Sequence, residues 1–230
     1  LAKMNLKTNK SLIRDSIRLN YPSPNALKYF VDSVSFFENF DSSFIYSDEI
    51  ALFAPTIKHL DQLYAVSGQL KGTVGDLTAK NIDLRFGKNT SINGDFSFFG
   101  LPKIRETFID INCQEAFLEP EDVVRYVPEK YHSRIRNTGK VNFKGEFLGF
   151  PTDFVSNGTF NTESGFIASD INFKLAEDNT AFYSGNLKLE RFDLGKILNK
   201  EKDFEEIYLN GDIKGHGLEV NNANFHLNAD

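Results

Sequence analysis

The sequence predicts an all-β fold, an elongated, curved, mainly antiparallel β-groove with a few short capping helices. Three observations predict it. The 230 residues include 23 Phe and no Trp. Most Phe alternate with polar residues, which is the period-two pattern of strands with one apolar face. Glycine recurs in the middle of these segments, where it weakens a strand unless the backbone bends or another chain segment comes close.

The alternating segments can be placed along the chain. Strands are predicted over 64–74, 82–98 (with a turn at 87–89), 139–149, 167–175, 183–189 and 207–213. Turn signals include 100–102, 137–139, 157–158 and 177–179. Strands and turns that repeat at about ten residues are typical of a meander. The polar opposite phase favours antiparallel strands that are covered on one side and wet on the other.

A loose repeat places glycine between two polar residues, which are flanked by aromatic or aliphatic ones. It occurs around Gly94, Gly145, Gly185 and Gly211. Because all four glycines fall on the apolar phase, they predict a bent sheet whose narrow, concave side is apolar.

Short helices are expected to interrupt the strands. They are predicted from the N-cap and proline signals at 24–34, 47–55, 120–128 and 193–198. Each begins with a capping residue or an early proline. Helices this short are not stable alone, so we expect them to cap or plug the apolar face of the sheet.

Composition excludes some classes of function. The net charge is -6 and the charges are dispersed, so the sequence lacks the basic surface of a nucleic-acid-binding protein. The acidic balance also argues against docking on anionic lipid headgroups. Cys113, the only cysteine, alternates with Ile109 and Ile111, and we expect it to be a small buried side chain.

The organisation of the chain is expected to be simple. Residues 1–62 are predicted to hold opening strands and short helices, and residues 63–230 a continuous β-groove. No run approaches the ~20 apolar residues of a membrane span. Because the alternation is already under way at residue 4 and continues to residue 229, we interpret the chain as an internal part of a longer protein.

The sequence offers little catalytic chemistry. It has no nucleophile elbow, no phosphate-binding loop and no histidine pair with metal-ligand spacing among His59, His132, His216 and His226. We therefore expect no enzyme activity, no cofactor and no metal. Asp15 is anomalous because it falls on the apolar phase between Ile13 and Ile17, which suggests a bulge or an exposed edge.

Several motifs, in this order along the chain, resemble a known family. They are VSGQLKGTV at 66–74, NIDLRFG at 81–87, INGDFSFFGLP at 92–102, ETFIDI at 106–111, EPEDVV at 119–124, SGNLKLERFDLGKIL at 184–198 and LNGDIKGHGL at 209–218. Together they resemble TamB-type translocation and assembly proteins of the AsmA-like superfamily, in a form similar to that of the Bacteroidota. The likeness covers most of residues 45–230.

The resemblance implies a long periplasmic protein with a taco-shaped sheet, or repeating β-groove. Such a protein is anchored by an inner-membrane helix and reaches an Omp85-type (TamA-like) partner in the outer membrane. The family is implicated in moving phospholipids between membranes and in assembling outer-membrane proteins. Because the anchor and the partner-binding region lie outside this chain, the chain corresponds to an internal stretch of the groove.

Three hypotheses follow. The first is a non-enzymatic conduit for phospholipid acyl chains, because an apolar lining removes the cost of ~0.8 kcal/mol per CH₂ of exposing them to water. Its predicted lining is Phe86, Phe96, Phe98, Val141, Phe143, Phe147, Ile171, Phe173, Leu187, Leu189, Leu209, Ile213, Phe225 and Leu227. The second is a periplasmic scaffold or chaperone that holds strands of outer-membrane proteins by β-augmentation. The third is a closed sandwich or barrel with an ordinary Phe core.

Overall fold

The computed structural model describes residues 6–14, 17–51, 60–200, 202–203, 205–217 and 224–229, and for 6, 17 and 224–229 it describes the backbone alone. The chain forms two compact units, unit 1 (Leu1–Gln114) and unit 2 (Glu115–Asp230). Each is described by itself below. The domain boundary expected between residues 62 and 63 stays a prediction.

Unit 1 is an antiparallel sheet whose strands follow chain order. Its strands are β1 (Leu6–Lys7), β2 (Leu12–Ile13), β3 (Ile17–Asn20), β4 (Ser35–Tyr46), β5 (Leu63–Gly72), β6 (Asp76–Phe86), β7 (Thr90–Phe99) and most of β8 (Phe108–Leu118). The hydrogen-bonded order is β1-β2-β4-β5-β6-β7, and β3 also pairs with β4. Bulges interrupt the β4–β5, β5–β6 and β6–β7 pairs.

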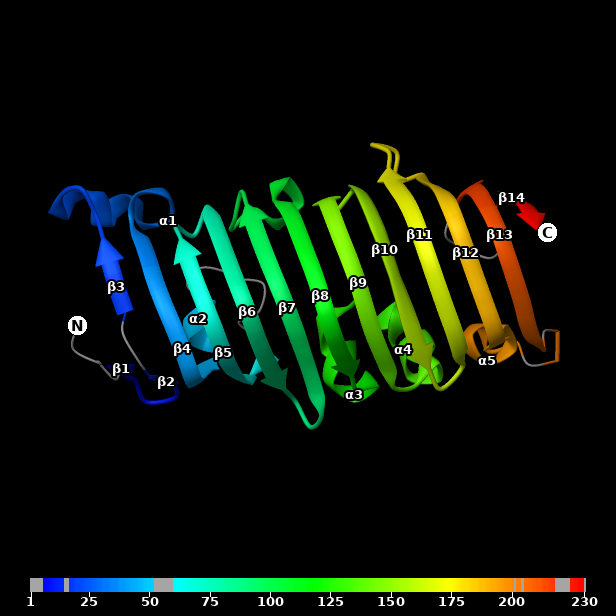
Figure 1. The fold of residues 1–230 in the computed structure, drawn as a ribbon, viewed down its shortest axis with the longest axis horizontal. Coiled ribbons are helices and arrows are strands. Elements are labelled where there is room, and N and C mark those ends of the chain that lie inside the picture. The colour runs from blue at the N-terminus through cyan, green and yellow to red at the C-terminus, as the bar shows by residue number, and fades with distance from the viewer. Residues whose placement is uncertain are drawn as a thin grey trace. The chain divides into compact units, whose positions relative to one another are not determined.

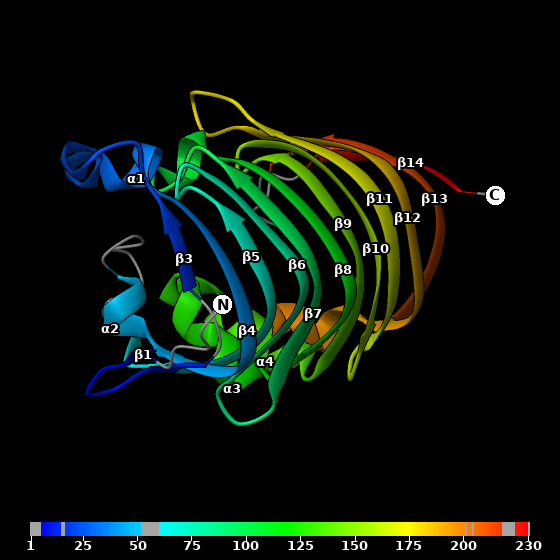
Figure 2. The same ribbon diagram turned by 60° about the vertical axis from the view of Figure 1, so that its left-hand side comes forward.

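Unit 2 repeats the same plan. Its strands are β9 (Val141–Phe150), β10 (Asp153–Thr162), β11 (Gly165–Leu175), β12 (Ala181–Asp193), β13 (Glu206–His216) and β14 (Asn224–Ala229). Each pairs antiparallel with the next one in the chain. Consecutive strands lie side by side in Figure 1, and within each unit they bend in the same direction in Figure 2.

The predicted fold class is confirmed: the fold is a mostly antiparallel, open, curved sheet with a few short helices. The closed sandwich or barrel considered from the sequence is wrong. Among the described residues of each unit, the strands continue a single sheet in chain order and do not turn back to build a second layer.

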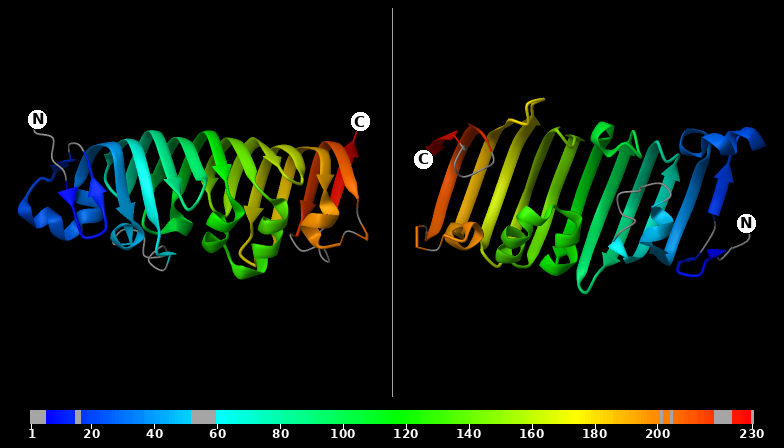
Figure 3. Two further views of the ribbon diagram at one scale, coloured as in Figure 1. Left: turned by 90° about the horizontal axis from the view of Figure 1, so that it is seen from below. Right: turned by 180° about the vertical axis from the view of Figure 1, so that it is seen from behind.

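The helices are short and lie at the ends of strands. They are η1 (Pro24–Tyr29), α1 (Phe30–Ser33), α2 (Ser47–Ile50), η3 (Ile104–Glu106), α3 (Pro120–Val123), η4 (Val124–Tyr126), η5 (Glu129–Tyr131), α4 (His132–Thr138) and α5 (Leu194–Leu198). In unit 2, α3, α4 and α5 lie on the concave side of the sheet, near one end of its strands (Figures 2 and 3). The short helices expected in unit 2 are therefore present at its sheet, and those expected at 24–34 and 47–55 in unit 1 are present in part, since the second half of 47–55 lies outside the described residues.

Strand β10 corrects one expectation from the sequence. The Asn157–Gly158 pair, interpreted as a turn, lies in the middle of this strand. Gly158 pairs with Gly145 on one side and Ser169 on the other. The dipeptide is a common turn signal, but here the glycine permits close packing: a Cβ on Gly158 would lie 2.7 Å from the carbonyl oxygen of Lys144.

At the mid-strand glycines, the neighbouring strand lies too close to leave room for a side chain. A Cβ on Gly145 would collide with the carbonyl oxygen of Asn157, and one on Gly94 with that of Asn112. Gly185 adds a φ of +150°, which side-chain-bearing residues rarely adopt. The predicted link between these glycines and a bent sheet is therefore supported by the local geometry of both units.

Candidate functional site

The strand register of unit 2 places the predicted lining residues on one face. Residues directly opposite each other in a ladder share a face. One cross-strand row runs through Phe143, Phe160, Ile167, Leu189 and Leu209. The residues of this face in unit 2 are called the apolar face below.

Further rows of the apolar face lie parallel to the first. One contains Phe147, Ser156, Ile171, Gly185, Ile213 and Leu227, and the next contains Gly149, Phe154, Phe173, Tyr183, Gly215 and Phe225. Val141 pairs with Thr162 and Leu187 pairs with Ser169, so both belong to the same face. The side chains of Phe225 and Leu227 lie outside the described ones, so only their register is known.

Unit 1 shows the same arrangement on its own sheet. Thr90 pairs with Phe86, and Phe96 and Phe98 follow Thr90 at even spacing along β7. Phe96 faces Ala79 and Phe98 faces Leu77 on β6. The three lining residues predicted in unit 1 therefore share one face of its sheet.

The lining side chains are shielded but not sealed. The burial of β9 and β10 alternates strictly between half-buried and exposed over most of their length, and the half-buried positions are those of the apolar face. Phe96, Phe143 and Phe173 are all half-buried. Large side chains that are close neighbours on one face shield one another, which explains intermediate exposure without a second sheet over them.

Aromatic stacking organises the apolar face. The ring centroids of Phe143 and Phe160 are 4.6 Å apart. Phe154 stands between two other rings, 4.6 Å from Phe147 and 4.9 Å from Phe173. These distances are those of favourable offset aromatic pairs. Phe154 and Phe160 were not among the predicted lining residues because β10, which carries them, was not recognised as a strand.

The opposite face is polar and wet. Its rows include Lys144–Thr159 and Glu146–Asn157–Asp170–Asn186–Asp212. His216 is exposed there and lies opposite Phe182. A few large apolar side chains are also exposed on this face, namely Leu148, Phe150, Val155 and Phe182. The two faces therefore differ strongly in polarity, as predicted.

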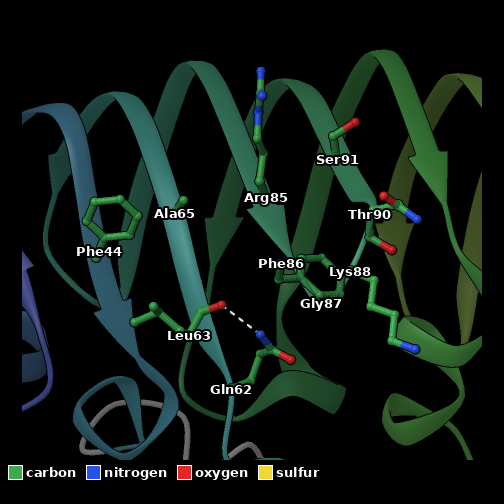
Figure 4. A pocket seen from close by; sticks show the side chains of 11 residues that line it. Phe44, Gln62, Leu63, Ala65, Arg85, Phe86, Gly87, Lys88, Thr90 and Ser91 are labelled. Carbon is green, nitrogen blue, oxygen red and sulfur yellow. Dashed lines mark hydrogen bonds between the residues drawn. The ribbon is translucent and has the colours of Figure 1, made fainter.

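Two small cavities lie away from the apolar face. The larger, of about 560 Å³, is at the β6–β7 turn of unit 1 and includes Phe86 alone among the predicted lining residues. In Figure 4 its two cationic side chains, Arg85 and Lys88, extend in different directions, and Arg85 is bound to Asp83 at 2.9 Å. A cavity whose cations diverge is a poor site for a discrete anion.

Other chemistry is sparse in the part of the chain that the structure describes. No group of three or more His, Cys, Asp or Glu side chains there is placed to hold a metal ion. None of the helices described is long and apolar enough to cross a membrane. Cys113 is buried, as predicted. Asp15 and His59 lie outside the described residues, as does the side chain of His226.

Comparisons of this chain with protein-family models, with curated proteins and with solved structures returned no match. The likeness to TamB-type proteins therefore depends on the motifs alone.

Proposed function

We propose that this chain is a non-enzymatic hydrophobic conduit that carries phospholipid acyl chains on the apolar side of its sheets. The observation that supports this best is the strand register, which aligns Phe, Ile and Leu from successive strands into rows that cross the strands. A row of this kind is a path along which an acyl chain keeps apolar contacts while it passes from strand to strand.

The half-buried state of these side chains also supports a binding role. Fully buried Phe would be ordinary core, and fully exposed Phe would favour aggregation. Acyl chains that lie against half-buried rings remove the remaining apolar surface from water, at about 25 cal/mol per Å². Headgroups remain in water because the sheet is open.

The wider setting of the conduit is part of the same proposal. The resemblance to TamB-type proteins suggests a periplasmic location, an inner-membrane anchor outside this chain and an Omp85-type partner in the outer membrane. It links the conduit to outer-membrane biogenesis. The second candidate, a scaffold for outer-membrane β-barrel proteins, would use the same apolar side or the sheet edges for protein strands.

Native mass spectrometry tests the proposal. The chain is produced in cells, where it meets phospholipid, and is purified without detergent. We expect mass additions that correspond to whole phospholipids and that disappear after extraction with organic solvent. The conduit would be contradicted by a folded chain that carries no lipid and takes up no phospholipid from added vesicles.

A further inference from the structure

The two margins of the apolar face in unit 2 are built differently. The helical margin is formed by α3, η4, η5 and α4, by the β10–β11 turn (162–165) and by α5. The turn margin, at the other ends of the same strands, is formed by the β9–β10 turn (150–153) and the β11–β12 turn (175–181). Figure 3 (right) shows the helices in front of the strands at the helical margin only.

Hydrogen bonds hold the helical margin closed. The Asn137 side-chain amide of α4 donates to the carbonyl oxygen of Lys196 at 2.7 Å and to Oδ1 of Asn199 at 2.8 Å, which joins α4 to α5. The buried Ser164 donates through its hydroxyl to the carbonyl oxygen of Asn137 at 2.8 Å. Two helices and a strand turn are thus tied together across this margin.

One cavity at the helical margin is a poor place for a phosphate. A cavity of about 190 Å³ there is lined by Glu119, Glu121 and Glu163. Its two cations already face carboxylates, Arg136 with Glu121 at 2.8 Å and Lys140 with Glu119 at 3.9 Å. A phosphodiester placed there would meet like charge before it met an available cation.

None of the described helices of unit 2 lies at the turn margin. Its turns carry Asp153, Glu177 and Asp178, and Asp153 pairs with Lys174 at 3.1 Å, so the difference between the margins is the covering by helices and not the charge. Its turns are held by backbone hydrogen bonds, from Leu175 N to Thr152 O at 2.7 Å and from Ala176 N to Thr180 O at 2.9 Å. Tyr183 lies on the apolar face, opposite Phe173 and Gly215, in the row next to the Leu175–Ala181 pair that ends the β11–β12 ladder at this margin. A half-buried Tyr in such a position has an apolar ring among the Phe and a hydroxyl that can reach water.

We propose that phospholipids lie on unit 2 in one orientation, with their acyl chains on the apolar face and their headgroups over the turn margin. This inference rests on the conduit proposed above. In it, Tyr183 is a positioning residue whose hydroxyl lies at the level of the glycerol esters and phosphate, while the helical margin keeps headgroups out. Acyl chains can then move across strands without crossing the helices.

Two photoactivatable phospholipids test the orientation with the full chain. One has a diazirine on its headgroup, and the other has a diazirine at the end of an acyl chain. After illumination, peptide mass spectrometry maps the adducts. We expect headgroup adducts at 150–153 and 175–183, and adducts from the acyl-chain end at Phe143 and Phe160, in the row farther from the turn margin.

The outcomes separate the two proposals. Headgroup adducts at 119–140 or 194–200, or equally at both margins, with acyl adducts intact, would overturn the orientation and leave the conduit standing. An absence of acyl adducts on the apolar face would overturn both.

A conservative variant adds a second readout. Tyr183→Phe keeps the ring and removes the hydroxyl, so phospholipid binding should weaken by about two- to ten-fold, the effect of one lost hydrogen bond. Headgroup adducts at the turn margin should fall, and acyl adducts should spread. Tyr208→Phe, which alters a 68% exposed residue of β13, is the matched control and should change neither. Identical binding and adducts in Tyr183→Phe and the control would remove Tyr183 from the proposal.

Discussion

At the scale of single residues, the choice of Phe is explained by the kind of surface it makes. Phe is large and apolar and has no polar atom that requires a partner. In unit 2 its rings stack on one another, and Phe143 also packs over glycine, where its ring edge lies 2.8 Å from the position of a Cβ on Gly158. The rings therefore support each other on one sheet without a second layer.

The apolar face should not tolerate a charge. Phe143→Asp should abolish phospholipid co-purification and cost roughly 1–3 kcal/mol of stability, because a half-buried ring and its stacking on Phe160 are lost. Lys144→Asp, on the exposed neighbouring position, should retain lipid and change stability by less than about 0.5 kcal/mol. Phe143→Leu keeps the surface apolar but removes the ring, so it separates the effect of lost packing on stability from the effect of a charge on lipid binding. Lipid counted by mass spectrometry and urea unfolding give the two readouts, and normal lipid content in folded Phe143→Asp would refute the assignment.

Asp95 supports a bulge on the polar face of unit 1. It accepts hydrogen bonds from the backbone N–H of Asn81 at 2.8 Å and from Lys80 at 3.0 Å, and Asn81 lies at the bulge with a positive φ of 51°. The Asn81 N–H, followed by the Lys80 ammonium, lowers the pKa of Asp95 below its usual value. The ionised carboxylate is therefore favoured in the folded state.

Stability should depend on pH through Asp95. The pKa of Asp95 is lower in the folded state than in the unfolded state. The ionised carboxylate therefore contributes its full stabilisation above the unfolded-state pKa, about 3.9, and this contribution is lost as the pH falls through the folded-state pKa. Urea midpoints measured from about pH 6 down to 2 should fall less steeply in Asp95→Asn than in the wild type. Asp110→Asn, an exposed change on β8, is the control. Parallel pH profiles for wild type and Asp95→Asn would show that this contact contributes nothing.

At the scale of secondary-structure elements, the sequence predicted seven strands, namely β5, β6, β7, β9, β11, β12 and β13, because their alternation is regular. β9, β11 and β13 keep one phase over most of their length, so their faces could be assigned residue by residue. The cap of α5 was also predictable, and the Asp193 carboxylate does accept from the N–H of Lys196 at 2.8 Å.

Several elements were not predicted, and for two of them the physical reason is clear. Helix α4 has no side-chain N-cap and no apolar periodicity around Ile135, and it is held by Asn137 through bonds to α5, a partner distant in sequence. Strand β10 contains Asn157–Gly158, a turn dipeptide by local propensity that tertiary packing against Gly145 keeps extended. Because β10 was not predicted, the stacking of Phe154 and Phe160 on rings of neighbouring strands was not predicted either.

The Asn137 contacts should decide whether α4 and α5 stay together. Asn137→Ala removes both side-chain hydrogen bonds, so it should destabilise this margin by about 1–2 kcal/mol. Hydrogen–deuterium exchange should become faster at 133–138 and 194–198 and remain unchanged in β10 and β11. Asn142→Ala, at an exposed position of β9, is the matched control. Unchanged exchange in Asn137→Ala would mean that apolar packing alone holds the helices.

At the scale of the whole chain, the account depends on the same pattern in both units. Each unit is one antiparallel sheet in chain order, with Phe-rich rows on one face and charged or amide rows on the other. Such a pattern can be extended strand by strand without limit, because each added strand continues the existing rows. This is the property that a conduit requires and that a closed core lacks.

Photo-crosslinking from two adjacent positions of β9 tests the central claim most directly. Phe147 lies on the apolar face, and Leu148, 44% exposed, lies opposite Val155 on the other. A photo-reactive residue at either position, in cells that make the protein, is followed by mass spectrometry of the adducts. The conduit predicts phospholipid adducts at 147 and few at 148. Equal labelling at both positions, or adducts at 147 that consist only of protein strands, would contradict it.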